Sequence, residues 1–250
     1  MTAEKKIVLI TGSDKGIGFE TAKELGEKGF YVILNARNQE KGEKAVSKLR
    51  KIDVSCDLTL FDVTKPEEIL GAEKIFNSKY SHLDVLINNA GVAFDNHQKP
   101  SKLPVNDIRD EFEVNFFGMI SVTQIFLNLL KQADHAKIIN ISSNMGSLGL
   151  ATDPHSQFYN VNSLGYQASK ASVNFATICF SKELINDGIT VNSVNPGWTA
   201  TEFGGRNLNQ PVPDGMQTVK QAAAQIVKIA SDSQNSLNCT FTENAGKLPW

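Results

Sequence analysis

The chain has 250 residues, 41% of them apolar and 21% charged, which is ordinary for a globular protein of one large domain or two small ones. Its 25 basic and 27 acidic residues leave a formal charge of −2, and no block of like charge indicates a nucleic-acid arm or a membrane-surface helix. No uninterrupted apolar run approaches the roughly 20 residues that span a bilayer, and the start, MTAEKKIVLITG, carries no secretory stretch with a cleavage site. We expect a cytoplasmic protein without nucleic-acid or membrane partners.

Short β-branched runs alternate with amphipathic stretches along nearly the whole chain. Strands are predicted at Lys6–Thr11, Tyr31–Ala36, Leu58–Asp62, Asp84–Asn88, Lys137–Ser142, Thr190–Asn195 and Asn238–Thr242. Helices are predicted at Gly16–Lys28, Gln39–Lys51, Pro66–Ser78, Ile108–Lys131, Gly165–Asn186 and Thr218–Ser231. Because helical crossovers join parallel strands, the predicted fold class is α/β. We expect one doubly wound parallel sheet, a three-layer α/β/α (Rossmann) arrangement, with residues 1–250 in a single domain.

Three polar connections are longer than the others and follow predicted strands: 91–106, 147–164 and 198–216. They leave the carboxyl ends of the strands, where an open α/β sheet binds its ligands. We predict that these connections form the substrate loops. Five large apolar residues in them hint at an apolar substrate, although each is equally compatible with covering the core: Phe94, Leu148, Phe158, Trp198 and Phe203.

A glycine-rich turn, TGSDKGIG, follows the first predicted strand and opens the first helix. Gly12, Gly16 and Gly18 permit a tight turn and a close approach of the backbone to a pyrophosphate, and the helix N-terminus favours the anion. No GK[ST] follows, which excludes a Walker phosphate loop. The turn predicts a dinucleotide site, in which Ser13, Lys15 and Ile17 also take part.

The second predicted strand ends in NARN, without the carboxylate that commonly binds an adenosine ribose in NAD-dependent folds. Arg37 can grip a 2′-phosphate through a bidentate pair, with Asn38 beside it and Lys15 as a second cation. These residues favour NADP(H) over NAD(H). The alternative is that Arg37 is a solvated residue opening the next helix.

Tyr166 and Lys170 lie four residues apart on a predicted helix. At about 100° per residue, their side chains are about 40° apart, on one face. Taken alone, this spacing also fits a tyrosine packed on a lysine stem. Tyr159 lacks such a partner, since Ser163 stands four residues after it, and we expect Tyr159 in a loop or pocket wall.

Further polar motifs follow the strands: NNAG at 88–91, ISS at 141–143 and NPG at 195–197, with Asn115 inside the helical stretch EVNFFG. In this order, over about residues 5–200, the chain resembles the short-chain dehydrogenase/reductase family in its single-domain form. The long stretch between Ser143 and Tyr166 and the ending GKLPW are similar to the carbonyl-reductase-like branch.

The resemblance implies four catalytic residues. Tyr166 would be the general acid/base and Lys170 its electrostatic partner. Ser143 would orient the carbonyl, with Ser142 as the competing serine. Asn115 would hold a water against the lysine.

The resemblance also assigns cofactor contacts beyond the glycine turn. Asp62 and Val63 would contact the adenine, Asn89, Ala90 and Gly91 the adenosine ribose and nearby backbone, and Pro196, Gly197 and Thr199 the nicotinamide, with Tyr166 and Lys170 also beside the cofactor. The alternatives are that Asp62 caps a turn, that Asn89 satisfies neighbouring backbone, and that Thr199 is a loop hydroxyl.

A lysine cation about 5 Å from a phenolate contributes roughly 3 kcal/mol at an effective dielectric near 20, which favours the phenolate, whereas burial opposes it. We expect the cation, aided by an oxidised nicotinamide, to prevail and to bring the pKa of Tyr166 to about 7–8. The expected function is NADPH-dependent reduction of an aldehyde, ketone or quinone. The alternative is a nucleotide-sensing regulatory protein that binds NADP(H) without turnover.

Two expectations concern other partners. Family members commonly form dimers or tetramers through the helix that carries Tyr166, so a homodimer or homotetramer is expected, with a monomer as the alternative. Cys56, Cys179 and Cys239 are widely spaced, without a CxxC motif or a histidine at ligand spacing, so we expect no metal site.

Overall fold

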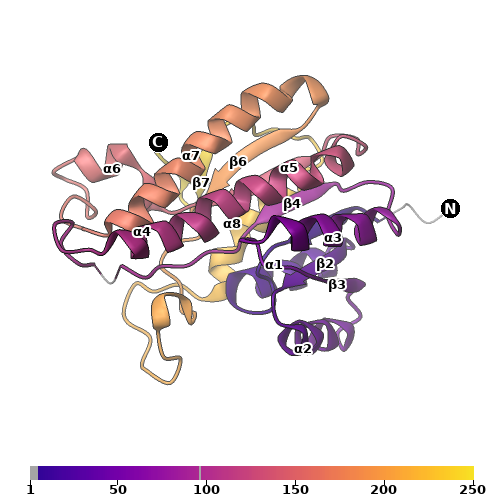
Figure 1. Cartoon of the computed structure of the whole chain (residues 1–250), viewed down its shortest axis with the longest axis horizontal. Coiled ribbons are helices and arrows are strands. Elements are labelled where there is room, and N and C mark those ends of the chain that lie inside the picture. Colours follow the sequence, from indigo (N-terminus) through magenta and orange to yellow (C-terminus); the bar gives the residue numbers. More distant parts are fainter. Residues whose placement is uncertain (1–4, 96) are drawn as a thin grey trace.

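The computed structural model describes residues 5–95 and 97–250, and it is built around one eight-stranded sheet (Figure 1). The strands are β1 Ile7–Ile10, β2 Tyr31–Ala36, β3 Cys56–Leu60, β4 Val85–Asn88, β5 Lys137–Ile141, β6 Thr190–Val194, β7 Phe241–Glu243 and β8 Gly246–Lys247. Their order is β3-β2-β1-β4-β5-β6-β7-β8, and every pair is parallel except β7 with β8. The α/β prediction is confirmed.

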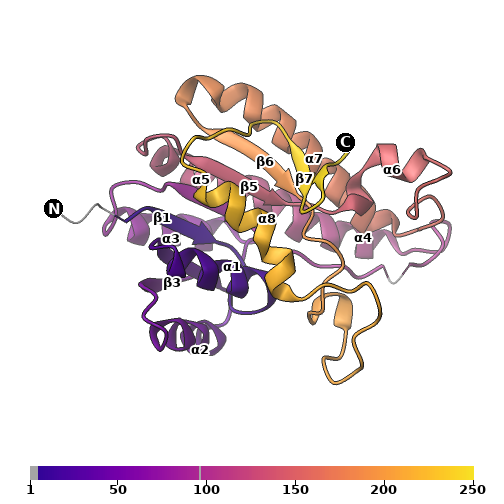
Figure 2. The ribbon, with the colours of Figure 1, turned by 180° about the vertical axis from the view of Figure 1, so that it is seen from behind.

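Helices cover both faces of the sheet (Figures 1 and 2). The α-helices are α1 Gly16–Glu27, α2 Gln39–Arg50, α3 Pro66–Asn77, α4 Val105–Phe112, α5 Met119–Leu130, α6 Leu148–Thr152, α7 Leu164–Leu184 and α8 Val219–Ser231. Shorter or irregular turns are the π-helix η1 Glu113–Gly118 and the 3₁₀ turns η2 Asn144–Gly146, η3 Ile185–Asp187 and η4 Phe203–Gly205. One apolar cluster joins α3, α5 and α7 to the sheet, and a second joins α1, α2 and α8 to its other face.

The central strands are buried on both faces, which explains their continuous apolar character. All four residues of β1 and of β4 are buried, as expected where helices cover both sides of a parallel sheet. In the first cluster Phe126 of α5 meets Phe76 of α3 edge to face, at 5.6 Å between ring centres. Such aromatic contacts fix the helices against the sheet.

The strand order reverses between β1 and β4, which pair in register from Val8 with Val85 to Ile10 with Ile87. Successive strands run outward in one direction from β1 and in the other from β4. The loops leaving β1 and β4 therefore diverge at the carboxyl ends of these strands, which is the usual ligand position in a doubly wound sheet.

Several element bounds differ from the sequence prediction, and the last strand is found at Phe241–Glu243 rather than Asn238–Thr242. The helix predicted at Ile108–Lys131 begins at Val105 and is interrupted by η1. The loop 147–164 contains α6, and the last strand is followed by the antiparallel β8. The third strand begins at Cys56 rather than Leu58, because its pairing with β2 starts there, at Val32 with Cys56.

The helical stretch Val105–Leu130 is continuous and largely apolar. It has 26 residues, and its mean hydropathy of 1.3 over an 18-residue window makes it long and apolar enough to cross a membrane by length and composition alone. Val122, Phe126 and Leu129 of this stretch pack in the core of the protein, which gives its apolar residues another role.

Candidate active site

Tyr166 and Lys170 lie on the same face of α7, at the end of the sheet where the β4 and β5 loops leave it. Lys170 Nζ is 5.8 Å from the centre of the Tyr166 ring and donates a 2.7 Å hydrogen bond to the carbonyl of Ile141, the last residue of β5. The lysine is buried, with 4% of its surface exposed, and burial lowers its pKa to about 8. The predicted pair is therefore brought together.

The pKa of Tyr166 departs from the expected value near 7–8. Burial raises it to about 12; a hydrogen bond with Ser143 acts in the opposite direction, and the charges of Glu111 and Asp95 add to the rise. The expectation was wrong for the chain without cofactor, because it gave the lysine more weight than the loss of water around the phenol. At neutral pH this phenol holds its proton.

The two serines after β5 face different groups. Ser142 Oγ donates to the carbonyl of Lys170 at 3.3 Å, which ties β5 to α7. Ser143 lies beside the Tyr166 phenol, and its hydroxyl accepts a 3.2 Å hydrogen bond from the amide of Met145. Of the two, Ser143 has the geometry to reach a group held by the tyrosine.

Asn115 is buried in the π-helix η1, with 2% of its surface exposed. Its Oδ1 accepts from the amide of Val92 at 2.8 Å, and its Nδ2 donates to the Val92 carbonyl at 2.9 Å and to Ser169 Oγ at 3.0 Å. The side chain thus ties the loop after β4 to α7. Both Nδ2 hydrogens are used in these bonds, whereas Oδ1 accepts one bond and can accept a second.

A side chain at Gly91 would crowd these residues. A Cβ at this position would lie 3.3 Å from Asn115 Oδ1 and 3.5 Å from Lys170 Nζ. The backbone of the β4 loop therefore passes directly over the lysine ammonium group.

The glycine turn after β1 is braced from β2 and β4. Gly12 and Gly16 have positive φ angles of 59° and 60°, a region that glycine adopts without strain. Asn89 Nδ2 donates to the carbonyls of Thr11 and Gly12 at 2.8 and 3.0 Å. The amide of Ala90 donates to Thr11 Oγ1 at 3.0 Å.

Three predicted residues of this region have structural roles in the chain alone. Ser13 is fully buried, and its Oγ donates to the Ile10 carbonyl at 2.8 Å and accepts from the amide of Asn35 at 3.0 Å. Ile17 packs at the margin of the second apolar cluster. Gly18 must be small, because a Cβ there would lie 2.8 Å from the carbonyl of Gly12.

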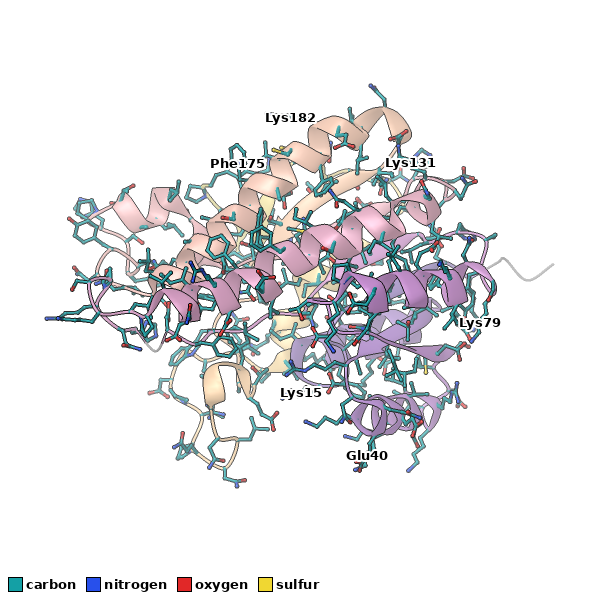
Figure 3. All side chains as sticks on the ribbon, viewed as in Figure 1. Lys15, Glu40, Lys79, Lys131, Phe175 and Lys182 are labelled. Carbon is teal, nitrogen blue, oxygen red and sulfur yellow. The ribbon has the colours of Figure 1, made fainter. Side chains whose placement is uncertain are left out.

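The residues predicted for a 2′-phosphate surround the end of β2. Arg37 is exposed and forms no ion pair within the described part of the chain. Asn38 caps α2, accepting from the amide of Lys41 at 3.0 Å. Lys15 extends from the glycine turn (Figure 3) and pairs with Glu202 of the loop 198–216. Sequence reasoning missed this pairing, since 187 residues separate the partners.

Asp62 and Val63 follow β3 at the same end of the sheet. Asp62 Oδ1 accepts from the amide and the hydroxyl of Thr64 at 2.9 and 2.8 Å. Burial tends to raise the pKa of this carboxyl, but the Thr64 hydrogen bonds and the charge of Arg37 together hold the pKa below its usual value. Val63 is buried against the π-helix, where a Cβ on Gly118 would come within 2.9 Å of it.

The loop after β6 is held by its own polar groups. Asn195 Oδ1 accepts from the amide of Gly197 at 3.1 Å, and Thr199 Oγ1 donates to the Gly197 carbonyl at 2.9 Å. Pro196 is half-buried, and Gly197 has a positive φ of 80°. Within the protein, Asp62 caps a turn, Asn89 binds neighbouring backbone and Thr199 is a loop hydroxyl. Contacts of these residues with a cofactor would be additional.

These residues fit a nicotinamide dinucleotide phosphate. Gly12 and Gly16 have positive φ angles, as the tight turn of a dinucleotide site requires, and the end of β2 presents the exposed guanidinium of Arg37, which has no ion pair in the described part of the chain. The residues assigned to the nicotinamide, Pro196, Gly197 and Thr199, lie in the loop after β6, which pairs with the strand β5 that leads to Ser143.

Two buried acids and an aromatic residue near Tyr166 were not predicted as site residues. Asp95 accepts from the amide of Tyr166 at 3.2 Å, and Glu111 accepts from the amide of Asp95 at 3.2 Å. The ring of Phe203 meets that of Tyr166 at 5.7 Å and 61°. Only for Phe203 did the sequence give a signal, as an apolar residue in a substrate loop.

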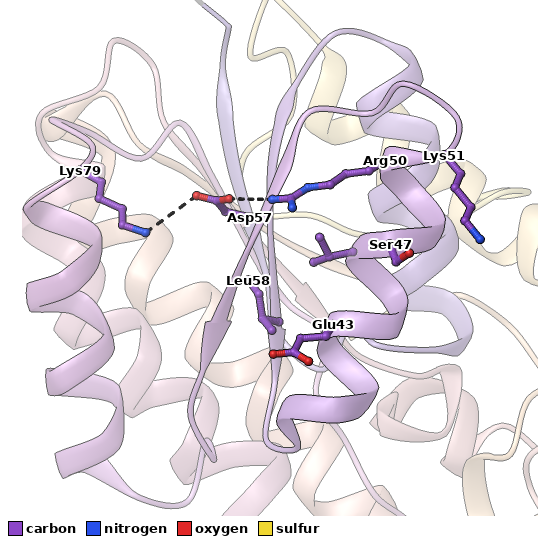
Figure 4. Close-up of a pocket in the computed structure, with 8 residues that line it drawn as sticks. Glu43, Ser47, Arg50, Lys51, Asp57, Leu58 and Lys79 are labelled. Atoms are coloured by element: carbon purple, nitrogen blue, oxygen red, sulfur yellow. Dashed lines mark hydrogen bonds and ion pairs between the residues drawn. The ribbon is translucent and has the colours of Figure 1, made fainter.

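Two cavities lie outside this cluster of residues. One of about 620 Å³ is at the outer edge of the sheet (Figure 4), lined by Glu43, Val46, Ser47, Arg50, Lys51, Asp57, Leu58 and Lys79. Another of about 290 Å³ lies between the 147–164 loop and the C-terminal hairpin, lined by Asn144, Leu150, Asp153, Ser156, Gln157, Phe158, Glu243 and Leu248. The second adjoins Ser143 through its neighbour Asn144. Within residues 5–95 and 97–250, no group of three or more His, Cys, Asp or Glu could hold a metal ion.

A family model described as short chain dehydrogenase matches residues 6–212. The chain belongs to this family. It is 33% identical over 235 residues to the short-chain dehydrogenase anuI of Penicillium roqueforti, covering 91% of this chain and 89% of that one. It is also 33% identical over 199 residues to 5-keto-D-gluconate 5-reductase of Escherichia coli, covering 79% and 73%.

Solved structures agree with the family assignment. An NADPH-bound carbonyl reductase from chicken fatty liver superposes with a TM-score of 0.85 at 26% identity, covering 99% of this chain and all of that one. A single-residue variant of actinorhodin polyketide ketoreductase, solved with NADPH, gives a TM-score of 0.80 at 25% identity, covering 97% and 96%. The protein is therefore an oxidoreductase of a family that uses nicotinamide cofactors.

Proposed function

We propose that the protein is an NADPH-dependent reductase that converts the carbonyl of an aldehyde, ketone or quinone to an alcohol. The observation that carries this proposal is the convergence of Tyr166, Lys170 and Ser143 beside the glycine at position 91. The NADPH-bound state of the chicken carbonyl reductase, whose whole length this chain covers, supports the choice of cofactor and substrate class.

The proposed chemistry assigns one task to each side chain. Bound NADPH supplies the hydride that reaches the carbonyl carbon. Ser143 donates a hydrogen bond to the carbonyl oxygen as negative charge develops there. Tyr166, protonated because its pKa is about 12, gives its proton to that oxygen as general acid. Lys170 stabilises the phenolate left behind.

Selection of the phosphorylated cofactor is assigned to the end of β2. Arg37 is exposed there, and Lys15 can approach the same place from the glycine turn once it leaves Glu202. Two cations around a dianionic 2′-phosphate favour NADPH through charge-assisted hydrogen bonds. The remaining proposed cofactor contacts are those set out from the family resemblance.

We propose that copies of the protein associate through the apolar outer surface of α7. Phe175 is 68% exposed on this helix (Figure 3), and Phe117 of η1 is 49% exposed. Covering these rings against a second copy would remove apolar surface from water. A dimer or tetramer is expected by size-exclusion chromatography with light scattering; a monomer that persists at high concentration would contradict it.

A cytoplasmic location remains our proposal as well.

The function is tested with a panel of aldehydes, ketones and quinones, following NADPH and NADH absorbance. Tyr166→Phe should lower kcat by about 10²–10⁴-fold and still bind NADPH, as measured by its fluorescence. Tyr159→Phe is the matched control, because Tyr159 is an exposed tyrosine of a neighbouring loop. Binding of NADPH without turnover of any carbonyl would instead favour the nucleotide-sensing alternative.

A further inference from the structure

A buried carboxylate from a distant loop caps the helix that carries Tyr166. Helix α7 starts after Ser163, whose side chain makes no capping bond to the helix. Instead, Ser163 Oγ donates to Asp95 Oδ1 at 2.6 Å, and the amide of Tyr166 donates to Asp95 Oδ2 at 3.2 Å. Asp95 thus takes the place of an N-cap, from a position 71 residues earlier in the chain.

Glu111 holds this cap in place. Its Oε1 accepts from the amide of Phe94 at 2.6 Å and from that of Asp95 at 3.2 Å. The two residues, Asp95 and Glu111, are 2% and 0% exposed, so neither is a solvated surface acid. A contiguous path therefore runs from α4, through the loop after β4, to the first turn of α7.

The path joins two parts of the proposed active site. The loop that contains Asp95 begins at Gly91, which lies over Lys170. The turn that Asp95 caps includes Tyr166 itself. Displacement of Asp95 would therefore move the tyrosine backbone relative to the loop that faces the lysine.

The electrostatic surroundings indicate a second consequence. A helix N-terminus carries a partial positive charge, which favours an anionic phenolate nearby. The carboxylate of Asp95 opposes this charge at the first turn of α7. The groups facing this region are Lys170 on α7, Glu111 and Asp107 on α4, and Asp95 and the main chain of His97 in the loop. Burial first, and then the charges of Glu111 and Asp95, raise the pKa of Tyr166.

We propose that Asp95, braced by Glu111, is a positioning residue for Tyr166 that fixes the first turn of its helix, and that its negative charge opposes formation of the phenolate. The inference rests on the proposed reductase function for its catalytic consequence. The capping of α7 by Asp95 concerns only the fold of the chain and does not depend on that function.

Two substitutions distinguish the effect of the Asp95 charge from the effect of its hydrogen bond to the Tyr166 amide. Asp95→Asn keeps an oxygen that accepts from Tyr166 and removes the charge, whereas Asp95→Ala removes both. Asp110→Asn is the matched control, because it removes one exposed carboxylate next to Glu111 on α4. All three are compared in their pH profiles of alcohol oxidation with NADP⁺, where Tyr166 must accept a proton.

In Asp95→Asn the pH midpoint of oxidation should fall by about half to one unit, with kcat at the plateau within about twofold of the parent protein. Asp95→Ala should lose about tenfold or more in kcat with little change in the KM of NADP⁺. Asp110→Asn should change neither quantity. An unmoved midpoint in Asp95→Asn overturns the role of the charge, and an Asp95→Ala variant as active as the control overturns the positioning role.

Amide hydrogen exchange at Tyr166 gives a test that needs no turnover. The parent and Asp95→Asn should protect this amide, and Asp95→Ala should exchange it at least about tenfold faster. Equal protection in all three would overturn the inference even if the protein is an active reductase. Loss of protection in Asp95→Ala, in a protein that reduces no carbonyl, would support the geometric inference and reject the proposed function.

Discussion

Lys170 Nζ lies 5.8 Å from the centre of the Tyr166 ring, yet it donates its 2.7 Å hydrogen bond to the carbonyl of Ile141. The lysine therefore acts on the phenol across space, while β5 fixes its position. Because burial lowers the pKa of Lys170 to about 8 and raises that of Tyr166 to about 12, both side chains hold their protons at neutral pH. This is the protonation state that the proposed carbonyl reduction needs.

A methyl group at position 91 should impair turnover. A Cβ there would lie 3.3 Å from Asn115 Oδ1, so Asn115 or the loop must shift slightly, and it would touch Lys170 Nζ at 3.5 Å. We expect Gly91→Ala to lower kcat/KM by about tenfold, because small displacements at a reacting centre are costly. Steady-state kinetics on the best carbonyl of the panel measures this.

Gly71→Ala serves as the control for Gly91→Ala. Gly71 is inside α3, and a Cβ there meets nothing within 4 Å. This change should leave kcat/KM unaltered and stabilise the protein by about 0.5–1 kcal/mol, because alanine loses less backbone entropy in a helix than glycine. Equal kinetics in the two variants would show that the space around Lys170 is not critical.

Cofactor preference should depend on Arg37. Loss of a charge-assisted pair to a 2′-phosphate predicts that Arg37→Ala raises the KM of NADPH by about tenfold and leaves that of NADH within about twofold. Lys44→Ala is the control, since Lys44 is an exposed lysine of α2 paired with Glu40. If Arg37→Ala raises the KM of NADPH and that of NADH equally, the guanidinium does not recognise the 2′-phosphate.

Glu202 should compete with the cofactor for Lys15. The pair is exposed, with 59% and 51% of the side-chain surfaces accessible, so its contribution is small. We expect Glu202→Gln to lower the KM of NADPH by about twofold to threefold and to leave NADH unaffected. A rise in the NADPH constant would mean that Glu202 helps, rather than hinders, binding.

Lys137 should make stability depend on alkaline pH. Its Nζ is buried under the end of α8 and donates to the carbonyls of Ile229, Ala230 and Asp232. Burial lowers its pKa from 10.5 to about 8. Between these values the unfolded chain binds more protons than the folded one, so the free energy of unfolding should rise with pH through this window, by at most about 1.4 kcal/mol per unit for this group.

Urea unfolding between about pH 7.5 and 9.5 measures this slope. Lys137→Met should flatten it in part, because the pKa of Lys170 is lowered to about 8 as well. The variant should also lose about 1–3 kcal/mol at neutral pH, since the helix-end carbonyls lose their donor. Lys228→Met, at an exposed lysine of α8, should change neither the slope nor the stability at neutral pH. An unchanged slope in Lys137→Met would contradict the role given to Lys137.

Local patterns predicted most of the sheet because each strand is short, apolar and bounded by turn residues. β2 was predicted from Tyr31 to Ala36, as the structure has it. The π-helix around Asn115 could not be predicted, because EVNFFG has the same residue pattern as ordinary helix. The hairpin at β8 is two residues long and carries no periodicity.

The candidate site was predictable where a motif carried it, and unpredictable where distant residues meet. The Tyr166 and Lys170 spacing placed both on one face of a helix. The Asp95 cap and the Lys15–Glu202 pair join residues far apart in the chain, and a single sequence contains no signal for either. The pKa of Tyr166 was misjudged for the same reason, because the extent of burial follows from the tertiary structure.

Residues 248–250 should affect the KM of the carbonyl substrate rather than that of the cofactor. Trp250 stacks on Phe241 at 5.8 Å and 23°, and its carbonyl accepts from the amide of Gly149 at 2.9 Å. Ser147 Oγ donates to the Pro249 carbonyl at 2.7 Å. These contacts anchor the start of α6, which lies in the long loop between the Ser143 and Tyr166 positions.

Deletion of residues 248–250 should therefore release α6 and the wall of the 290 Å³ cavity that Leu150 and Leu248 line. We expect the KM of the carbonyl substrate to rise by about fivefold to tenfold, because a loop that must be ordered on binding costs free energy. The KM of NADPH should stay within about twofold, since the glycine turn and Arg37 are remote from this contact. Lys247→Ala, at an exposed residue of β8 that leaves the anchor intact, is the control. If the truncated protein loses affinity for NADPH and substrate alike, the C-terminus supports the whole fold instead of the substrate loop.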